Sequence, residues 1–155
     1  MRSKTCCFSG HRKIPPMQSE QIAERLWTEI MDLISAGYVS FIAGGALGFD
    51  TMAELAVLKI KQSYPQIILT LALPCKTQTR GWDKNDIQFY EAIKRKSDNV
   101  IYTSEEYTSG CMFKRNRFLV DNSSVCICYL TEDSGGTAYT VGYAKNEGLK
   151  IINLA

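Results

Sequence analysis

The chain has 155 residues, of which 45% are hydrophobic, and this size and composition are typical of one globular domain with a packed core. It carries 18 Lys and Arg against 16 Asp and Glu, so its formal net charge at pH 7 is only +2. That balance excludes the concentrated positive charge of a dedicated duplex-DNA binder. The sequence shows no signal-peptide pattern at its start and no apolar run near the ~18 residues of a membrane span, so we expect a cytoplasmic protein without a membrane partner.

In chain order, the predicted elements are a strand (4–9), a helix (22–34), a strand (39–43), a helix (51–61), a strand (67–73), a helix (83–95), a strand (99–102), a helix (111–120), a strand (125–130), a helix (136–146) and a strand (150–154). Most of the strand runs are apolar throughout, which indicates that helices cover both faces of the sheet. The β-α-β order then predicts a mainly parallel sheet of about six strands with right-handed crossovers. We therefore expect an α/β, Rossmann-like three-layer sandwich, formed by a single domain over residues 1–155.

Six cysteines could form disulfides, bind a metal or fill the core. No two of them have the C-x2-C spacing, Cys126 and Cys128 lie inside an apolar strand run, and the only histidine is His11. Zinc sites usually draw on such spaced pairs. We therefore expect reduced thiols that act as apolar strand residues, with no metal ligands and no required cofactor.

Ligands of open parallel sheets bind beyond the carboxyl ends of the strands, and here those ends carry glycine-rich and polar segments. The candidate residues that follow the first, second and fifth strands are Ser9, Gly10, His11 and Arg12; Gly44, Gly45, Gly48 and Asp50; and Ser134, Gly135, Gly136 and Thr137. Two glycine-rich turns that each lead into a helix offer backbone N–H groups and the positive end of a helix dipole to an anion. They predict a phosphate site, although glycines in such turns also occur for purely conformational reasons.

Basic side chains near the same edge could complete that site. Arg12 and Arg115 can form bidentate contacts to a phosphate or carboxylate, and Asn116 adds a donor and an acceptor. Arg117 is expected on a solvated helix face. His11 lacks a partner typical of acid–base catalysis, so we expect it to bond either a ligand or a neighbouring loop.

Three further residues leave alternatives open. Asp50 and Glu54 are four residues apart, on one face of the predicted helix entry. Asp50 either caps that helix or contacts the ligand, and Glu54 is the better candidate for a ribose hydroxyl. Trp82 either stacks on a base or packs locally. Neither glycine-rich turn is a standard dinucleotide or Walker motif, so we do not expect NAD chemistry or Walker-type ATP hydrolysis.

Five segments together resemble the YpsA-like family of the SLOG superfamily: SGHR (9–12), GGALGFDTMAE (44–54), LALPC (71–75), FKRNRFLVDNSS (113–124) and SGGTAYTVGYA (134–144). The resemblance spans nearly the whole chain and implies a Rossmann-like domain that binds a nucleotide or nucleotide-derived ligand. GGALGFD and RNR also resemble the DNA processing protein A family, which binds single-stranded DNA. SGGT resembles the phosphate loop of the Lonely Guy phosphoribohydrolases, which split a nucleoside monophosphate into base and ribose 5-phosphate.

The chain departs from the phosphoribohydrolase pattern, since Ala138 to Val141 follow the SGGT turn where that family has a glutamate pair. Glu54 is the one weak candidate for a substitute catalytic acid. The first prediction is therefore a nucleotide-binding, ligand-sensing or regulatory module. Two alternatives remain: an N-glycosidase that acts on nucleoside monophosphates, and a single-stranded nucleic-acid binder, which the near-neutral charge disfavours. The sequence leaves open whether the chain is enzymatic and whether it forms a homo-oligomer.

Overall fold

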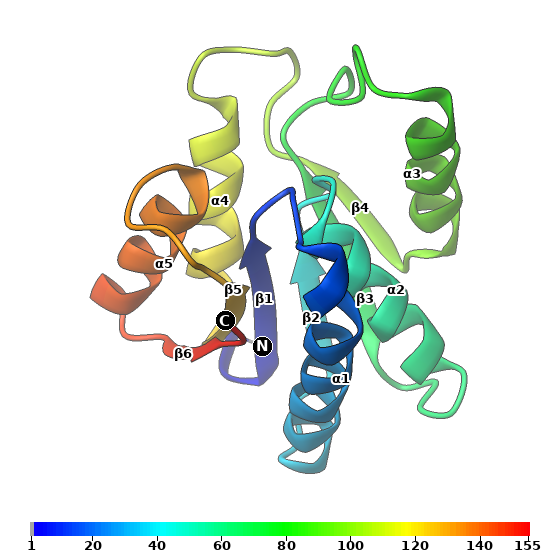
Figure 1. The fold of residues 1–155 in the computed structure, drawn as a ribbon, viewed down its shortest axis with the longest axis vertical. Coiled ribbons are helices and arrows are strands. Elements are labelled where there is room, and N and C mark those ends of the chain that lie inside the picture. Colours follow the sequence, from blue (N-terminus) through cyan, green and yellow to red (C-terminus); the bar gives the residue numbers. More distant parts are fainter. Residues whose placement is uncertain (1) are drawn as a thin grey trace.

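A computed structural model describes residues 2–155 of the chain (Figure 1). Its strands and α-helices alternate as β1 (Thr5–Gly10), α1 (Ser19–Ser35), β2 (Ser40–Ala43), α2 (Phe49–Lys61), β3 (Ile68–Leu73), α3 (Lys84–Lys96), β4 (Asn99–Tyr102), α4 (Cys111–Asp121), β5 (Val125–Tyr129), α5 (Gly136–Asn146) and β6 (Lys150–Asn153). All six strands pair in parallel within one sheet, in the order β4-β3-β2-β1-β5-β6. The predicted Rossmann-like three-layer fold is confirmed.

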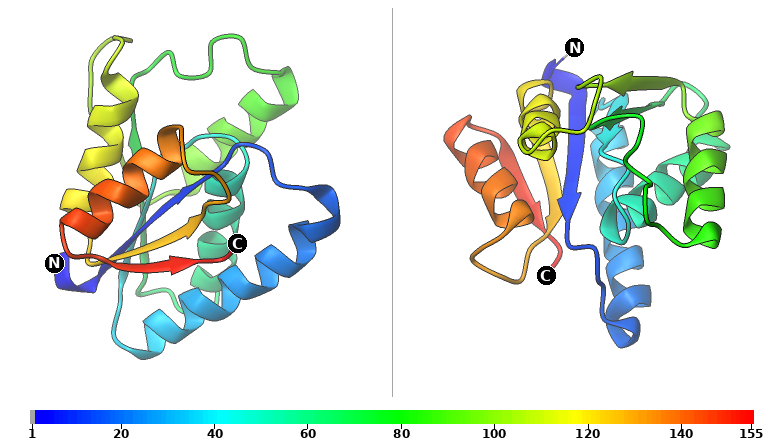
Figure 2. Two further views of the ribbon diagram at one scale, coloured as in Figure 1. Left: turned by 60° about the vertical axis from the view of Figure 1, so that its left-hand side comes forward. Right: turned by 90° about the horizontal axis from the view of Figure 1, so that it is seen from above.

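The helices form two layers, with α1, α2 and α3 on one face of the sheet and α4 and α5 on the other (Figure 2). Successive strand residues enter opposite layers: Phe8 packs in the α1–α3 layer, while its neighbour Cys7 packs in the α4–α5 layer. Because both faces are covered, both sets of side chains must be apolar. This is why the central strands read as continuous apolar runs.

The periodicity of the first predicted helix (22–34) corresponds to a buried face, whereas Leu55, which the same spacing places inward on the second predicted helix, is 43% exposed. In α1, the stripe formed by Ile22, Leu26, Ile30 and Leu33 is buried. Helix α2 begins at Phe49, two residues before the predicted start, because the fully buried Phe49 side chain anchors its first turn. Within residues 2–155, no helix has both the length and the apolar character needed to span a membrane.

All six cysteines are buried free thiols, but the prediction that they are strand residues holds for four of them, since Cys75 follows β3 and Cys111 begins α4. Cys6 and Cys7 belong to β1, and Cys126 and Cys128 to β5, where they fill the sheet interior. Among the residues that the structure describes, no three His, Cys, Asp or Glu side chains are grouped so that they could hold a metal ion.

The strand order also determines where a ligand can enter. From β1 the chain moves outward through β2, β3 and β4, and then returns to place β5 and β6 on the other side of β1. The carboxyl ends of β1 and β5 therefore flank the point at which the strand order reverses. Such a switch point leaves a crevice between the loops that follow the two strands.

A matched pair of Leu→Ala variants tests the assignment of the core. Leu26 is fully buried in α1, whereas Leu55 in α2 is 43% exposed. We expect Leu26→Ala to lower the free energy of unfolding by about 2–5 kcal/mol, and Leu55→Ala to lower it by less than about 1 kcal/mol. Urea denaturation measures both, and comparable losses would contradict this arrangement of the helices.

Candidate functional site

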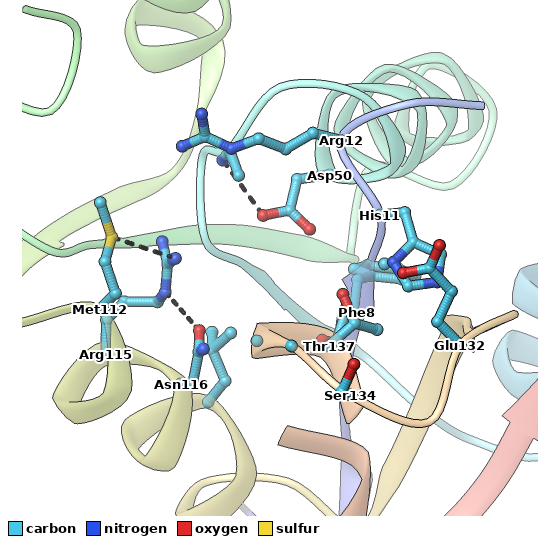
Figure 3. Close-up of a pocket in the computed structure, with 16 residues that line it drawn as sticks. Phe8, His11, Arg12, Asp50, Met112, Arg115, Asn116, Glu132, Ser134 and Thr137 are labelled. Atoms are coloured by element: carbon cyan, nitrogen blue, oxygen red, sulfur yellow. Dashed lines mark hydrogen bonds between the residues drawn. The ribbon is translucent and has the colours of Figure 1, made fainter. Parts of the chain in front are cut away.

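A pocket of about 310 Å³ opens at the switch point, beyond the ends of β1 and β5 (Figure 3). Four segments line it: Phe8, Ser9, Gly10, His11 and Arg12 from β1 and its following loop; Ala46 and Asp50 from the β2–α2 region; Met112, Arg115, Asn116 and Leu119 from α4; and Glu132, Ser134, Gly135, Gly136 and Thr137 from the β5–α5 region. Segments distant in sequence thus meet at the edge that the sequence pattern predicts.

Most of the candidate ligand-binding residues lie in this pocket. Gly44, Gly45, Gly48 and Glu54 do not line it. Five lining residues were missed in the sequence: Phe8, Ala46, Met112, Leu119 and Glu132. The helical spacing around Arg115 was a usable signal for two of them, since Met112 lies three residues before it and Leu119 four residues after it, on the same face of α4.

Arg115 lines the pocket as a buried cation, with only 6% of its surface exposed. Its Nη1 donates a hydrogen bond to the carbonyl oxygen of Gly44, and its Nε donates to Oδ1 of Asn116 at 2.7 Å. A Cβ on Gly44 would lie 2.6 Å from Nη1, so glycine leaves the space that the guanidinium occupies.

The hydrogen-bond acceptors of this guanidinium are uncharged. Its Nη2 lies 3.8 Å from the thioether sulfur of Met112, and no carboxylate in residues 2–155 forms an ion pair with Arg115. Burial lowers the pKa of Arg115, an effect that the charge of Asp50 opposes. Since a guanidinium stays protonated in proteins, the wall of the pocket holds a desolvated positive charge.

The turn between β2 and α2 is held by two carboxyl groups from α2. Oδ2 of Asp50 accepts a hydrogen bond from the N–H of Ala46, and Oε2 of Glu54 accepts one from the N–H of Gly45, both at 3.1 Å. Asp50 therefore holds the preceding turn and makes no N-cap hydrogen bond to α2. These two backbone N–H groups already have acceptors within the protein.

Burial raises the pKa of both carboxyl groups. For Asp50, the charges of Arg115 and Arg12 and hydrogen bonds to the turn oppose the rise. For Glu54, repulsion from Asp50 adds to the effect of burial, and the pKa lies well above its usual value. The turn is thus held by the carboxyl group of Asp50, which lines the pocket, and by that of Glu54, which does not line it and resists ionisation.

The turn between β5 and α5 has a different character. Ser134, Gly135 and Gly136 are exposed. Gly135 precedes α5 with φ of +99°, and no atom of another segment lies within 4 Å of the position that a Cβ would take there. The first N–H groups of a helix have no acceptor within the helix, and they lie at the positive end of its dipole. This turn therefore presents open donors at the pocket.

His11 fastens two of the loops around the pocket. Its Nε2 accepts a hydrogen bond from the N–H of Thr131 at 3.0 Å, and its ring lies edge-on to Tyr129 with centroids 5.8 Å apart. Of the two predicted roles for His11, the structure displays the bond to a neighbouring loop. Arg117 lies outside the pocket and donates to the hydroxyl of Tyr139 at 3.0 Å.

Comparison with protein families and curated sequences gives consistent matches. The YpsA model, described as the YspA SLOG family, matches residues 12–151. YoqJ, an SPbeta prophage-derived protein of Bacillus subtilis strain 168, is 28% identical over 138 residues, which cover 81% of each chain. A UPF0398 protein of Bacillus thuringiensis strain Al Hakam is 30% identical over 132 residues, covering 83% of this chain and 72% of that protein.

Solved structures share the fold at low sequence identity. DNA processing protein A of Streptococcus pneumoniae superposes with a TM-score of 0.69 at 14% identity, over 97% of this chain and 50% of its own, so this chain spans half of that protein. The Helicobacter pylori protein, whose single-stranded DNA binding mode is described, gives 0.67 at 16% identity, over 96% and 64% of the two chains. TM1055 gives 0.60 at 17% identity, over 96% and 72%.

The raised pKa of Glu54 predicts how stability depends on pH. Above about pH 4.5 this group ionises in the unfolded chain, while in the folded protein it stays protonated until the pH reaches its raised pKa. Within that window, the group therefore lowers the free energy of unfolding by about 1.4 kcal/mol for each unit of rising pH. In Glu54→Gln, this loss should be absent, while the amide oxygen still accepts from Gly45.

Urea denaturation at a series of pH values checks this expectation. The stability of Glu54→Gln relative to the wild type should increase with pH above 4.5. Glu24→Gln, which removes an exposed carboxylate on α1 that forms no ion pair within residues 2–155, serves as the control and should track the wild type. A constant difference between the wild type and Glu54→Gln would contradict the buried, protonated state of this carboxyl.

Proposed function

Because this chain belongs to the YpsA family of SLOG domains, we propose that it is a cytoplasmic ligand-sensing domain whose switch-point pocket binds a nucleotide or nucleotide derivative. The phosphate lies at the N-terminus of α5, against the turn formed by residues 134–137. Arg115 contacts the phosphate from the opposite wall of the pocket, and Arg12 from the rim.

The burial of Arg115 beside uncharged acceptors is the observation that carries this proposal. A buried cation that no carboxylate contacts as an ion pair is costly, even with Asp50 in the same pocket, and the cost falls when an anion enters beside it. A phosphate provides that charge and accepts the fork of N–H groups that a guanidinium offers. The open amides at the start of α5 also favour a negative charge. Two independent features of the pocket therefore favour the binding of an anion.

Two carboxyl groups in the same pocket suit the sugar of a nucleotide. Asp50 and Glu132 line the wall and can accept hydrogen bonds from ribose hydroxyls. With about 310 Å³, the pocket lies at the small end of the ~300–1,000 Å³ that is typical of ligand sites. This volume suits a ribose phosphate, with the base toward the opening.

The glycosidase alternative receives less support from the geometry. Its candidate acid, Glu54, does not line the pocket and holds the N–H of Gly45. Asp50 is the buried carboxyl that does reach the pocket, and it holds the N–H of Ala46. Release of free adenine from adenosine 5′-monophosphate, abolished by Glu54→Gln, would favour the enzyme over the sensor.

Calorimetric titration with adenosine 5′-monophosphate tests the anion site. We expect saturable binding, with adenosine itself at least about tenfold weaker because it lacks the phosphate. Arg115→Ala should weaken binding of the monophosphate by about tenfold or more, and Arg115→Lys by less.

Arg117→Ala is the matched control, since it removes the same charge from the same helix outside the pocket. It should retain the wild-type affinity to within about twofold. Equal losses in Arg115→Ala and Arg117→Ala would indicate a diffuse charge effect, and equal binding of adenosine and its monophosphate would refute a phosphate site.

A further inference from the structure

A second pocket, of about 260 Å³, lies between α2 and α3. The two pockets share no lining residue. They are closest at the β2–α2 turn, where Gly45 and Leu47 line the second pocket and Ala46 lines the first. Its wall is formed by Gly45, Leu47, Thr51, Glu54, Leu55, Trp82, Asp86, Phe89, Tyr90 and Ile93.

Aromatic rings form much of this wall. Trp82 meets Tyr90 edge-on, with ring centroids 5.4 Å apart, and Phe89 is 58% exposed. The Nζ of Lys94, which does not line the pocket, lies 5.3 Å from the centroid of the Tyr90 ring. The Tyr90 ring therefore already attracts one cation of the protein, and the pocket offers further aromatic faces of the kind that bind cations.

The charged side chains that line the two pockets differ, because the first pocket has Arg12 and Arg115 as well as Asp50 and Glu132. The second pocket is lined by the carboxyl groups of Glu54 and Asp86 and by no lysine, arginine or histidine. Glu54 is 2% exposed, and only its Oε2 has a hydrogen-bond donor within residues 2–155, the N–H of Gly45. The remaining oxygen can accept a hydrogen bond from a ligand.

Two alternatives were open for Trp82, stacking on a base or local packing. In the structure Trp82 packs against Tyr90, and it also forms part of the wall of this second pocket.

We propose that this second pocket binds a small planar organic cation of the amidinium or guanidinium type. Its flat face lies against the aromatic side chains of Trp82 and Phe89, and its N–H groups donate to the carboxylate of Glu54. A planar delocalised cation satisfies both requirements, since it stacks on aromatic rings and pairs with carboxylates. Asp86 adds a second negative charge from α3.

The groups that surround Glu54 determine whether its carboxyl group releases a proton when a cation binds. Burial and the charge of Asp50 keep its pKa high, whereas Arg115 on α4 and the N–H of Gly45 lower it. Asp86 and Tyr90 face the pocket from α3. A cation that pairs with Glu54 favours the ionised form, so binding below the pKa of the free protein must expel a proton. Affinity should therefore rise with pH, by at most about tenfold per unit.

The experiment uses benzamidinium as the probe, with benzamide as its neutral isostere and benzoate as its anionic one. The chain contains two tryptophans, so Trp27→Phe leaves Trp82 as the only indole reporter. We expect benzamidinium to quench the fluorescence of Trp82 saturably, with benzamide at least about tenfold weaker and benzoate without effect. The affinity for benzamidinium should increase with pH.

Three variants in that background locate the site. Glu54→Gln should weaken benzamidinium binding by about tenfold or more and remove its pH dependence. Phe89→Ala, at an exposed position that the core does not need, should also weaken it. Glu24→Gln, which removes an exposed carboxylate on α1 outside the pocket, should not change it.

Any of three results would overturn the proposal: no saturable quenching by benzamidinium, equal binding of benzamide, or full affinity in both Glu54→Gln and Phe89→Ala. Equal binding of benzamide would point to a neutral ligand instead. Since none of these readouts involves the phosphate site, the outcome is independent of the proposed function.

Discussion

The burial of Arg115 is the constraint on which the rest of the site depends. A guanidinium can enter the interior only where hydrogen-bond acceptors replace water, and here the carbonyl of Gly44 and the amide of Asn116 do so. A Cβ at position 44 would displace this guanidinium, so glycine there and the conformation of the β2–α2 turn both favour the position of Arg115. The carboxyl groups of Asp50 and Glu54 accept hydrogen bonds from the N–H groups of that turn. The arginine, the turn and the two carboxyl groups therefore form one connected unit.

The two glycine-rich turns have different roles in this arrangement. The β2–α2 turn is internally bonded and supports Arg115, whereas the β5–α5 turn is exposed and has open space in front of Gly135. The supporting turn lies between two pockets, of which only the first is lined by arginine side chains. These pockets are the proposed sites for an anion at the switch point of the sheet and for a cation beside α3.

The sequence predicts the fold well because both periodicity and apolar character are local properties. The continuous apolar runs identify the strands, and the spacing of Ile22, Leu26 and Ile30 identifies a helix, without knowledge of the tertiary structure. The roles of the glycines are not local. The four-residue spacing of Asp50 and Glu54 places both on one helix face, but it does not reveal that the preceding turn folds back to donate its N–H groups to them. The second pocket was missed for the same reason, since α2 and α3 meet only in the folded chain.

The most direct test of the account locates the bound anion residue by residue. In a ¹H–¹⁵N correlation titration of the uniformly labelled chain with adenosine 5′-monophosphate, the backbone amides of Gly135, Gly136 and Thr137 should shift most strongly. The amides of Gly45 and Ala46, which already have carboxyl acceptors, should move little. Large shifts at Gly45 and Ala46 with no response at residues 135–137 would contradict the division between a supporting turn and a ligand-binding turn.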